Sequence, residues 1–183
     1  MDINNESILI QECKSGNSTA FGLLIRNYNK KLFHYLYKLS GNRELAEDIM
    51  QEILIKIWQA FPAYNEQNKF SSWLFTIAHN TSIDTIRKNI KKSKHLDSND
   101  IETVVSNENP LTNLEVDEAK KRINNIVESL PMKQKEVFLL RMNMELSFKE
   151  ISEITNEPLN TVLSHMNYSV KKIRKALENE YSK

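Results

Sequence analysis

The stretch KFSSWLFTIAHNTSIDTIRKNIKK, residues Lys69 to Lys92, decides the fold because its apolar and polar residues recur at helical spacing. At about 100° per residue, one narrow stripe of a helix collects an indole, an amide, a carboxylate and two cations. The residues of this stripe are Trp73, Ile77, Asn80, Asp84, Arg87 and Lys91. Aromatic groups stack on bases and cations neutralise phosphates, so the stripe suits a nucleic-acid surface. The same helix could instead be a core helix, and periodicity alone does not choose between the two interpretations.

The composition of the 183 residues predicts an almost entirely helical protein. The chain has three glycines and four prolines, which leaves few points where a helix must stop. Hydrophobic residues make up 40% of it, enough for packed cores. No apolar run approaches the roughly 18 residues that span a membrane. The amino-terminal sequence MDINNES also lacks a secretory pattern. We therefore expect a cytoplasmic protein without membrane insertion.

Cysteine, histidine and glycine usage argues against a metal centre and against catalysis. Cys13 is the one cysteine, and the four histidines show no ligand spacing with it or with carboxylates. Three glycines cannot supply a phosphate-binding loop, and the common hydrolase and metalloprotease motifs are absent from the sequence. We expect no metal, no cofactor and no catalytic residue.

The net charge of +1 is divided unevenly along the chain. Residues 1–92 carry 12 Lys and Arg against nine Asp and Glu, residues 93–113 carry one against four, and residues 114–183 carry 12 against 11. Residues 93–113 also lose helical periodicity in favour of Ser, Asn and acidic residues, which predicts a flexible acidic linker. Two small helical domains, residues 1–92 and 114–183, should flank it. Composition does not decide whether the linker is an inert tether or lies in a nucleic-acid channel.

Three helices are predicted before the opening stretch. They are Glu6–Ser15, ended by Gly16, a long helix from the capping residue Ser18 to Gly41, and Glu44–Ala60. The outer face of the third helix combines acids and amides with one isoleucine, namely Asp48, Gln51, Glu52 and Ile55. Such a face is usually only solvated, so the pattern alone favours that interpretation over a partner surface.

The last third of the chain predicts a helix-turn-helix. Ser147 and Glu150 form an S-x-x-E capping box that opens one helix, and the turn Asn156–Pro158 leads to another. The second helix is expected to bury Val162, Met166, Val170, Ile173 and Leu177. The opposite side would then carry Thr161, Ser164, His165, Tyr168 and Lys172. Polar groups at the start of a second helix suit entry into the major groove, with a plain helical hairpin as the alternative.

Three segments in this order resemble the extracytoplasmic-function (ECF) branch of bacterial RNA polymerase sigma factors. They are AEDIMQEILIKIW (46–58), KFSSWLFTIAHNTSIDTIRK (69–88) and LPMKQKEVFLLRMNMELSFKEISEITNEPLNTV (130–162). The resemblance spans nearly the whole chain and implies an all-α fold of two domains, region 2 and region 4, joined by a flexible linker. It also implies a sigma factor that binds core RNA polymerase and opens promoters without catalysis of its own. A helix-turn-helix regulator that is not a polymerase subunit remains the alternative.

The resemblance also implies roles for residues of region 2. The helix Glu44–Ala60 would dock on the β′ clamp helices of the polymerase, with Ile55 as a buried contact and with polar anchors at Asp48, Gln51 and Glu52. The loop Phe61–Phe70 and the following helix would open the minus-ten element and hold a flipped base. The residues expected to contact this DNA are Trp73, Asn80, Asp84, Arg87, Lys88 and Lys91. The linker would run through the polymerase channel toward the active centre.

Region 4 would contact the β flap of the polymerase and the minus thirty-five element of promoter DNA. The expected DNA contacts are Thr161, Ser164, His165, Tyr168, Lys171 and Lys172. Family members often carry basic residues where this chain has Leu163, His165 and Tyr168. Fewer cations imply fewer phosphate contacts, so we expect a lower or less salt-dependent affinity for this element. The resemblance further implies an anti-sigma factor as a partner.

Overall fold

The computed structural model describes residues 3–65, 69–95 and 122–181. All regular structure within these ranges is helical, which confirms the predicted all-α fold. The chain divides into two compact units, Met1–Ser98 and Asn99–Lys183. Helix α4 (Phe70–His95) continues three residues past the predicted end of the first domain at residue 92. The rest of the predicted linker, residues 96–113, lies outside the described residues.

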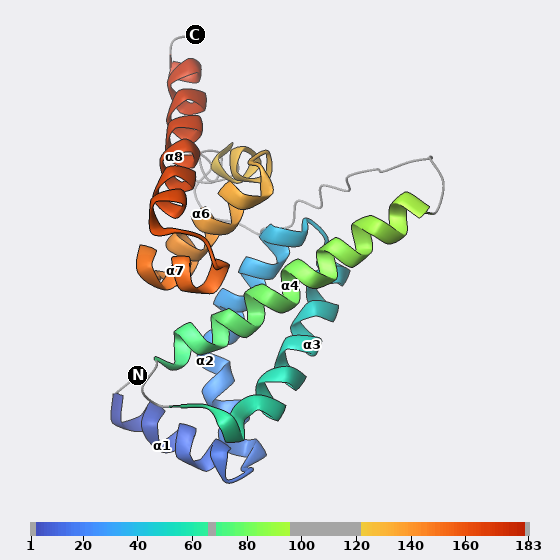
Figure 1. Cartoon of the computed structure of the whole chain (residues 1–183), viewed down its shortest axis with the longest axis vertical. Helices are drawn as coiled ribbons and strands as arrows, with labels where there is room; N and C mark the ends of the chain where they lie inside the picture. The colour runs from blue at the N-terminus through green and yellow to red at the C-terminus, as the bar shows by residue number, and fades with distance from the viewer. Residues whose placement is uncertain (1–2, 66–68, 96–121, 182–183) are drawn as a thin grey trace. The chain divides into compact units, whose positions relative to one another are not determined.

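Within residues 3–65 and 69–95, the first unit is a bundle of the helices α1 to α4 (Figure 1). Helices α1 (Ile3–Lys14), α2 (Ser18–Ser40) and α3 (Arg43–Ala60) are followed by the short 3-10 helix η1 (Phe61–Ala63) and by α4. Helix α2 packs against α1 and α3, and α4 packs against α3 and α2. Fully buried side chains from these helices meet in one core: Leu24, Leu32, Tyr35, Leu36, Ile49, Ile53, Ile57, Phe61 and Leu74. Their recurrence at three and four residues is what places them on the inner faces of the helices.

The ends of the first helices are set by local backbone chemistry. Gly16 and Gly41 have left-handed backbones, with φ of 87° and 68°, as expected for residues that end helices. Helix α2 is capped by Asn17, whose side-chain oxygen accepts hydrogen bonds from the N–H groups of Thr19 (3.0 Å) and Ala20 (3.1 Å). The prediction that Ser18 caps this helix was wrong by one residue. An Asn one position earlier reaches the same unpaired N–H groups.

The second unit contains a helical segment at residues 122–128 and the helices α6 (Met132–Met144), α7 (Phe148–Thr155) and α8 (Leu159–Tyr181). Helix α8 packs against both α6 and α7. The predicted capping box is confirmed, because the N–H of Ser147 donates to Glu150 (2.8 Å) and the N–H of Glu150 donates to Ser147 (3.2 Å). Asn156 ends α7 in a left-handed conformation, with φ of 53°. Helices α7 and α8 thus form the predicted helix-turn-helix.

The inner face of α8 is buried less completely than predicted, because Val162 is buried whereas Met166, Ile173 and Leu177 are only half-buried. Val170 was expected to be buried but is 41% exposed, whereas Ser169 is fully buried. The Ser169 hydroxyl donates to the backbone oxygens of Gln134 (3.3 Å) and His165 (2.9 Å). A small, hydrogen-bonded residue lets α8 approach α6 closely, and a hydrophobic pattern does not reveal such a position.

Two properties of the described ranges bear on function. None of their helices is both long enough and apolar enough to cross a membrane. They also contain no cluster of three or more His, Cys, Asp or Glu side chains that could hold a metal ion.

Candidate polymerase and nucleic-acid interfaces

The outer face of α3 exposes an apolar side chain among polar ones. Ile55 is 57% exposed, and Asp48 and Gln51 are exposed on the same helix. A β-branched apolar residue open to water in this setting has no role in the core of its own unit. The structure therefore brings three of the four predicted polymerase contacts to an open surface.

Glu52, the fourth predicted polymerase contact, is partly engaged within the bundle. Its Oε2 accepts a hydrogen bond from the Thr85 hydroxyl of α4 (3.2 Å), and its Oε1 pairs with Lys56 (2.7 Å). Lys56 also donates to the Thr81 hydroxyl (3.2 Å). The hydrogen bond from Lys56 lowers the pKa of Glu52 below its usual value, against the smaller opposing effect of burial. We call Glu52, Lys56, Thr81 and Thr85 the α3–α4 bracket, because they join the two helices through polar side chains.

Trp73, at the start of α4, belongs to an aromatic cluster. Its ring centroid lies 4.8 Å from that of Tyr64, 5.6 Å from Phe61 and 5.7 Å from Phe70. Trp73 is half-buried, while Phe61, Tyr64 and Phe70 are buried. Edge-on and tilted rings stabilise such clusters, which here anchor both ends of the loop between η1 and α4. Residues 66–68 of this loop lie outside the described residues.

The rest of α4 has a buried face and an exposed face. Leu74, Phe75 and Ala78 are buried in the core. On the other side the predicted DNA contacts are exposed, namely Asn80, Asp84, Arg87, Lys88 and Lys91. Figure 1 shows the last turns of α4 projecting from the bundle.

His79 is a buried polar residue of α4 whose contact with α2 sequence reasoning missed. It is 4% exposed, and its Nδ1 lies 3.1 Å from the hydroxyl of the fully buried Tyr35 on α2. This contact ties α2 to α4 next to the exposed Asn80. The sequence contains one sign of this contact, because His79 falls in the apolar stripe of α4, directly before the polar Asn80.

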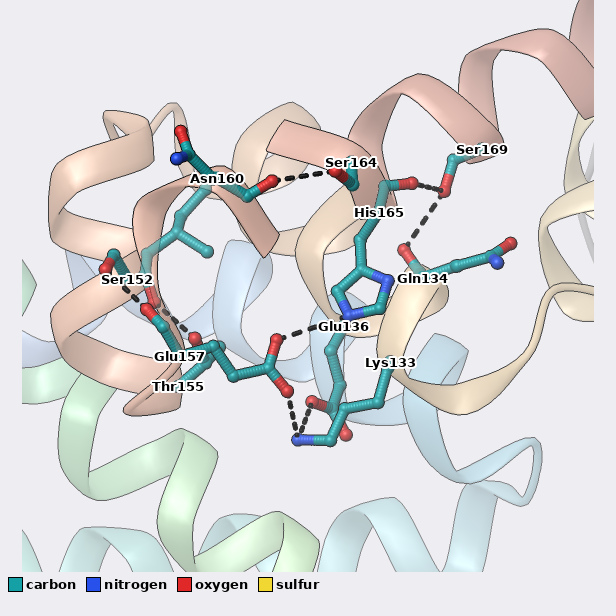
Figure 2. Close-up of polar contacts among 11 residues, drawn as sticks. Lys133, Gln134, Glu136, Ser152, Thr155, Glu157, Asn160, Ser164, His165 and Ser169 are labelled. Carbon is teal, nitrogen blue, oxygen red and sulfur yellow. Dashed lines mark hydrogen bonds and ion pairs between the residues drawn. The ribbon is translucent and has the colours of Figure 1, made fainter. Parts of the chain in front are cut away.

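The predicted DNA face of α8 is only partly open. Tyr168 is 62% exposed, and Ser164, Lys171 and Lys172 are also exposed, whereas Thr161 and His165 are half-buried. The ammonium of Lys172 donates to the backbone oxygen of Ser129 (2.7 Å), so Lys172 helps to attach α8 to the preceding segment. The imidazole of His165 faces Glu157 rather than solvent (Figure 2).

Comparisons with known proteins agree with this architecture. A family model described as Sigma-70 region 2 matches residues 24–91, and one described as Sigma-70, region 4 matches residues 120–173. The ECF RNA polymerase sigma factor SigW of Bacillus subtilis (strain 168) is 32% identical over 180 residues, which span 92% of this chain and 94% of that protein. The ECF RNA polymerase sigma-E factor of Escherichia coli (strain K12) is 25% identical, over 96% of this chain and 93% of that protein.

Two solved structures share the fold. The sigma factor RpoE of Bartonella quintana, in complex with the anti-sigma factor NepR, has a TM-score of 0.75 and 21% identity and covers 86% of this chain and 96% of its own. CnrH, in complex with the cytosolic domain of CnrY, has a TM-score of 0.69 and 19% identity, over 96% and 98% of the two chains.

The matched regions define a sigma factor built from regions 2 and 4, a class of transcription initiation factor. Within that class, this chain belongs to the ECF group of the sigma-70 family. The expected function as an ECF sigma factor is confirmed, and the alternative of a regulator outside the polymerase is not favoured.

Proposed function

We propose that the chain directs core RNA polymerase to promoters through three separate surfaces. The outer face of α3 docks on the β′ clamp helices, the exposed face of α4 engages the minus-ten element, and α8 enters the major groove at the minus thirty-five element. One observation supports the first step above all. Ile55 is 57% exposed between polar residues, although the adjacent inward positions Ile53 and Ile57 are fully buried.

Region 2 also has the chemistry needed to open DNA. The aromatic cluster around Trp73 and the exposed amide of Asn80 lie on the same side of α4 as the cations Arg87, Lys88 and Lys91. Extruding a base costs a few kcal/mol of stacking, which aromatic and amide contacts can offset. The cations would neutralise the adjacent phosphates. Asp84, exposed between amide and cations, would limit which base edges are accepted.

Region 4 would add a second contact with promoter DNA, weaker and more selective than that of region 2. The exposed side chains of α8 include Ser164, Tyr168 and Lys171, with few cations on the first two turns. Phosphate contacts therefore supply little of the affinity, and base contacts supply more of the selectivity. The β flap of the polymerase would support this region from another side.

Other assignments follow from this role. The reaction chemistry would belong to the polymerase, so the chain itself would not be an enzyme, and its place of action would be the cytoplasm. Two similar structures were solved with a bound partner, the anti-sigma factor NepR in one and the cytosolic domain of CnrY in the other. We accordingly propose that an anti-sigma factor covers the polymerase-binding face of α3 when transcription is not required.

Reconstitution with core RNA polymerase tests the proposal. Promoter-specific run-off transcripts from genomic fragments are expected with the wild-type chain, and their mapped 5′ ends would define the promoter elements. Ile55→Ala should reduce binding to the core enzyme. The matched control is Ile8→Ala on α1, where the side chain is 58% exposed, and this variant should bind core normally. DNA binding without any effect on initiation would instead support a regulator that uses only α7 and α8.

A further inference from the structure

We propose that Glu157 is a positioning residue for promoter recognition. Its carboxylate fixes His165 at the start of α8, so that His165 orients the recognition helix and does not touch DNA. This inference rests on the proposed function of α8 as the helix that reads the minus thirty-five element. It assigns His165 a different role from the direct DNA contact that the resemblance implied.

Glu157 is held firmly in the turn between α7 and α8. Its backbone oxygen accepts a hydrogen bond from the Ser152 hydroxyl (2.6 Å), and its N–H donates to the backbone oxygen of Ser152 (3.2 Å). Its side chain is 18% exposed and lies between two nitrogen atoms (Figure 2). Oε1 is 3.2 Å from Nζ of Lys133 on α6, and Oε2 is 3.3 Å from Nε2 of His165 on α8. The carboxylate of Glu157 therefore connects the turn to α6 and to α8.

The charge on Lys133 is shared between two carboxylates. Its ammonium also lies 3.3 Å from Oε2 of Glu136, a residue only 1% exposed. Burial lowers the pKa of Lys133, but Glu136 and Glu157 together outweigh that effect and raise it. Glu136 is the more deeply buried of the two carboxylates. The ammonium of Lys133 is therefore not available to Glu157 alone.

His165 is placed to complete the compensation of Glu157. Oε2 of Glu157 is buried and, within the described part of the chain, accepts no hydrogen bond of good geometry. Nε2 of the imidazole lies 3.3 Å from this oxygen. A buried carboxylate oxygen favours the nearest available donor, so the ring turns toward the turn and away from the open face of α8. Rotating it outward to reach a base would remove this approach.

The position of this contact along α8 gives it influence over recognition. Farther along the helix, Ser169 and Lys172 attach α8 to the backbone of Gln134 and Ser129. The Glu157 contact acts nearer the amino-terminal end, which is the end that enters the groove in a helix-turn-helix. It therefore sets the angle at which exposed side chains such as Ser164 and Tyr168 meet the bases.

The test uses holoenzyme reconstituted from core RNA polymerase and the full chain. The probes are promoter fragments with start sites mapped for the wild type, together with versions that carry changed minus thirty-five sequences. Affinity for each fragment is measured over a range of salt concentrations for Glu157→Gln, His165→Gln and the double variant. Lys171→Gln serves as the control for an exposed cation on the same helix.

A plot of log affinity against log salt concentration falls with a negative slope. We expect Lys171→Gln to make this slope less steep by about one, as the loss of one phosphate contact does. His165→Gln should leave this slope unchanged. Both Glu157→Gln and His165→Gln should change the order of preference among the fragments. The double variant should change it no more than the larger single change, because both substitutions remove the same contact.

Three results would overturn the proposal: a slope reduced by about one in His165→Gln, additive effects in the double variant, or an equal loss at every fragment. Thermal unfolding of each variant shows whether region 4 remains folded. If Glu157→Gln does unfold it, Lys133→Gln provides a second route, because it loosens Glu157 without altering an exposed residue of α8 and should reorder the same preferences. Failure of the wild-type holoenzyme to select any start site would contradict the proposed function instead.

Discussion

The thiol of Cys13 lies on the inner face of α1, where only 2% of the residue is exposed. Burial, with a smaller contribution from Glu12, raises the pKa of this thiol to about 11. The nucleophilic thiolate is therefore scarce at about pH 8. We expect iodoacetamide to label the native chain slowly and the urea-unfolded chain fully, as measured by mass spectrometry. Equal labelling rates in the two states would contradict the buried position.

Glu52 predicts a pH dependence of stability. Because its pKa is lowered in the folded state, its charged form stabilises the fold above the pKa of the unfolded carboxyl group. This contribution is lost as the pH falls through the lowered pKa of the folded state. We expect Glu52→Gln to be less stable than the wild type near neutral pH, by less than about 1 kcal/mol because the pair with Lys56 is largely exposed. The difference should shrink in acid.

The matched control for this prediction is Glu47→Gln. Glu47 pairs with Arg43 at 3.0 Å, at the same helical spacing and on the same helix as Glu52 and Lys56. Chemical unfolding of the three proteins across acidic and neutral pH makes the comparison. If the stability difference between Glu52→Gln and the wild type instead grew as the pH fell, the prediction would be contradicted.

At the scale of single elements, helix caps provide the sharpest contrast. Ser147 caps α7 within a capping box, whereas Ser18 is the first residue of α2 and Asn17 supplies the cap. We expect Ser147→Ala to destabilise region 4 by about 1 kcal/mol. Ser18→Ala should change stability by less than about 0.5 kcal/mol. Urea unfolding followed by circular dichroism measures both, and equal losses would argue against the cap assignment.

Features that depend on a few neighbouring residues could be predicted from the sequence. The capping box at Ser147 and the helix ends at Gly16 and Gly41 require no knowledge of distant contacts. The core positions of α2 and α3 follow from helical spacing alone. The exposure of Ile55 was also predictable, because it falls outside the apolar stripe of its helix.

Features that depend on close packing between helices could not be predicted. Ser169 is buried because α8 approaches the backbone of Gln134. The hydrophobic pattern instead predicts that Val170 is the buried residue. The inward orientation of His165 depends on Glu157, eight residues earlier, and on how many partners Lys133 has. The engagement of Glu52 by Thr85 requires knowing how α4 crosses α3. Polar pairs between helices leave no periodic signal in a sequence.

At the scale of the whole molecule, each of the two compact units has its own core. Ile53 of the first and Ile151 of the second are both fully buried. Each substitution by alanine should cost about 2–5 kcal/mol through lost burial and the cavity left behind. We expect Ile53→Ala to lower the unfolding midpoint of region 2 alone, and Ile151→Ala that of region 4 alone.

Thermal unfolding with a separate probe for each unit measures this independence. Both tryptophans, Trp58 and Trp73, belong to region 2, so their fluorescence reports on that unit, and the helical signal reports on both. A joint shift of both transitions in either variant would show that the units unfold together.

The shielded thiol on α1 has a consequence for how oxidants can act on this molecule. Peroxide and disulfide stress act first on exposed thiolates, and this chain has one sulfhydryl group, kept protonated inside the bundle. In the folded chain, Cys13 is therefore a poor direct target for a sulfhydryl-based stress signal.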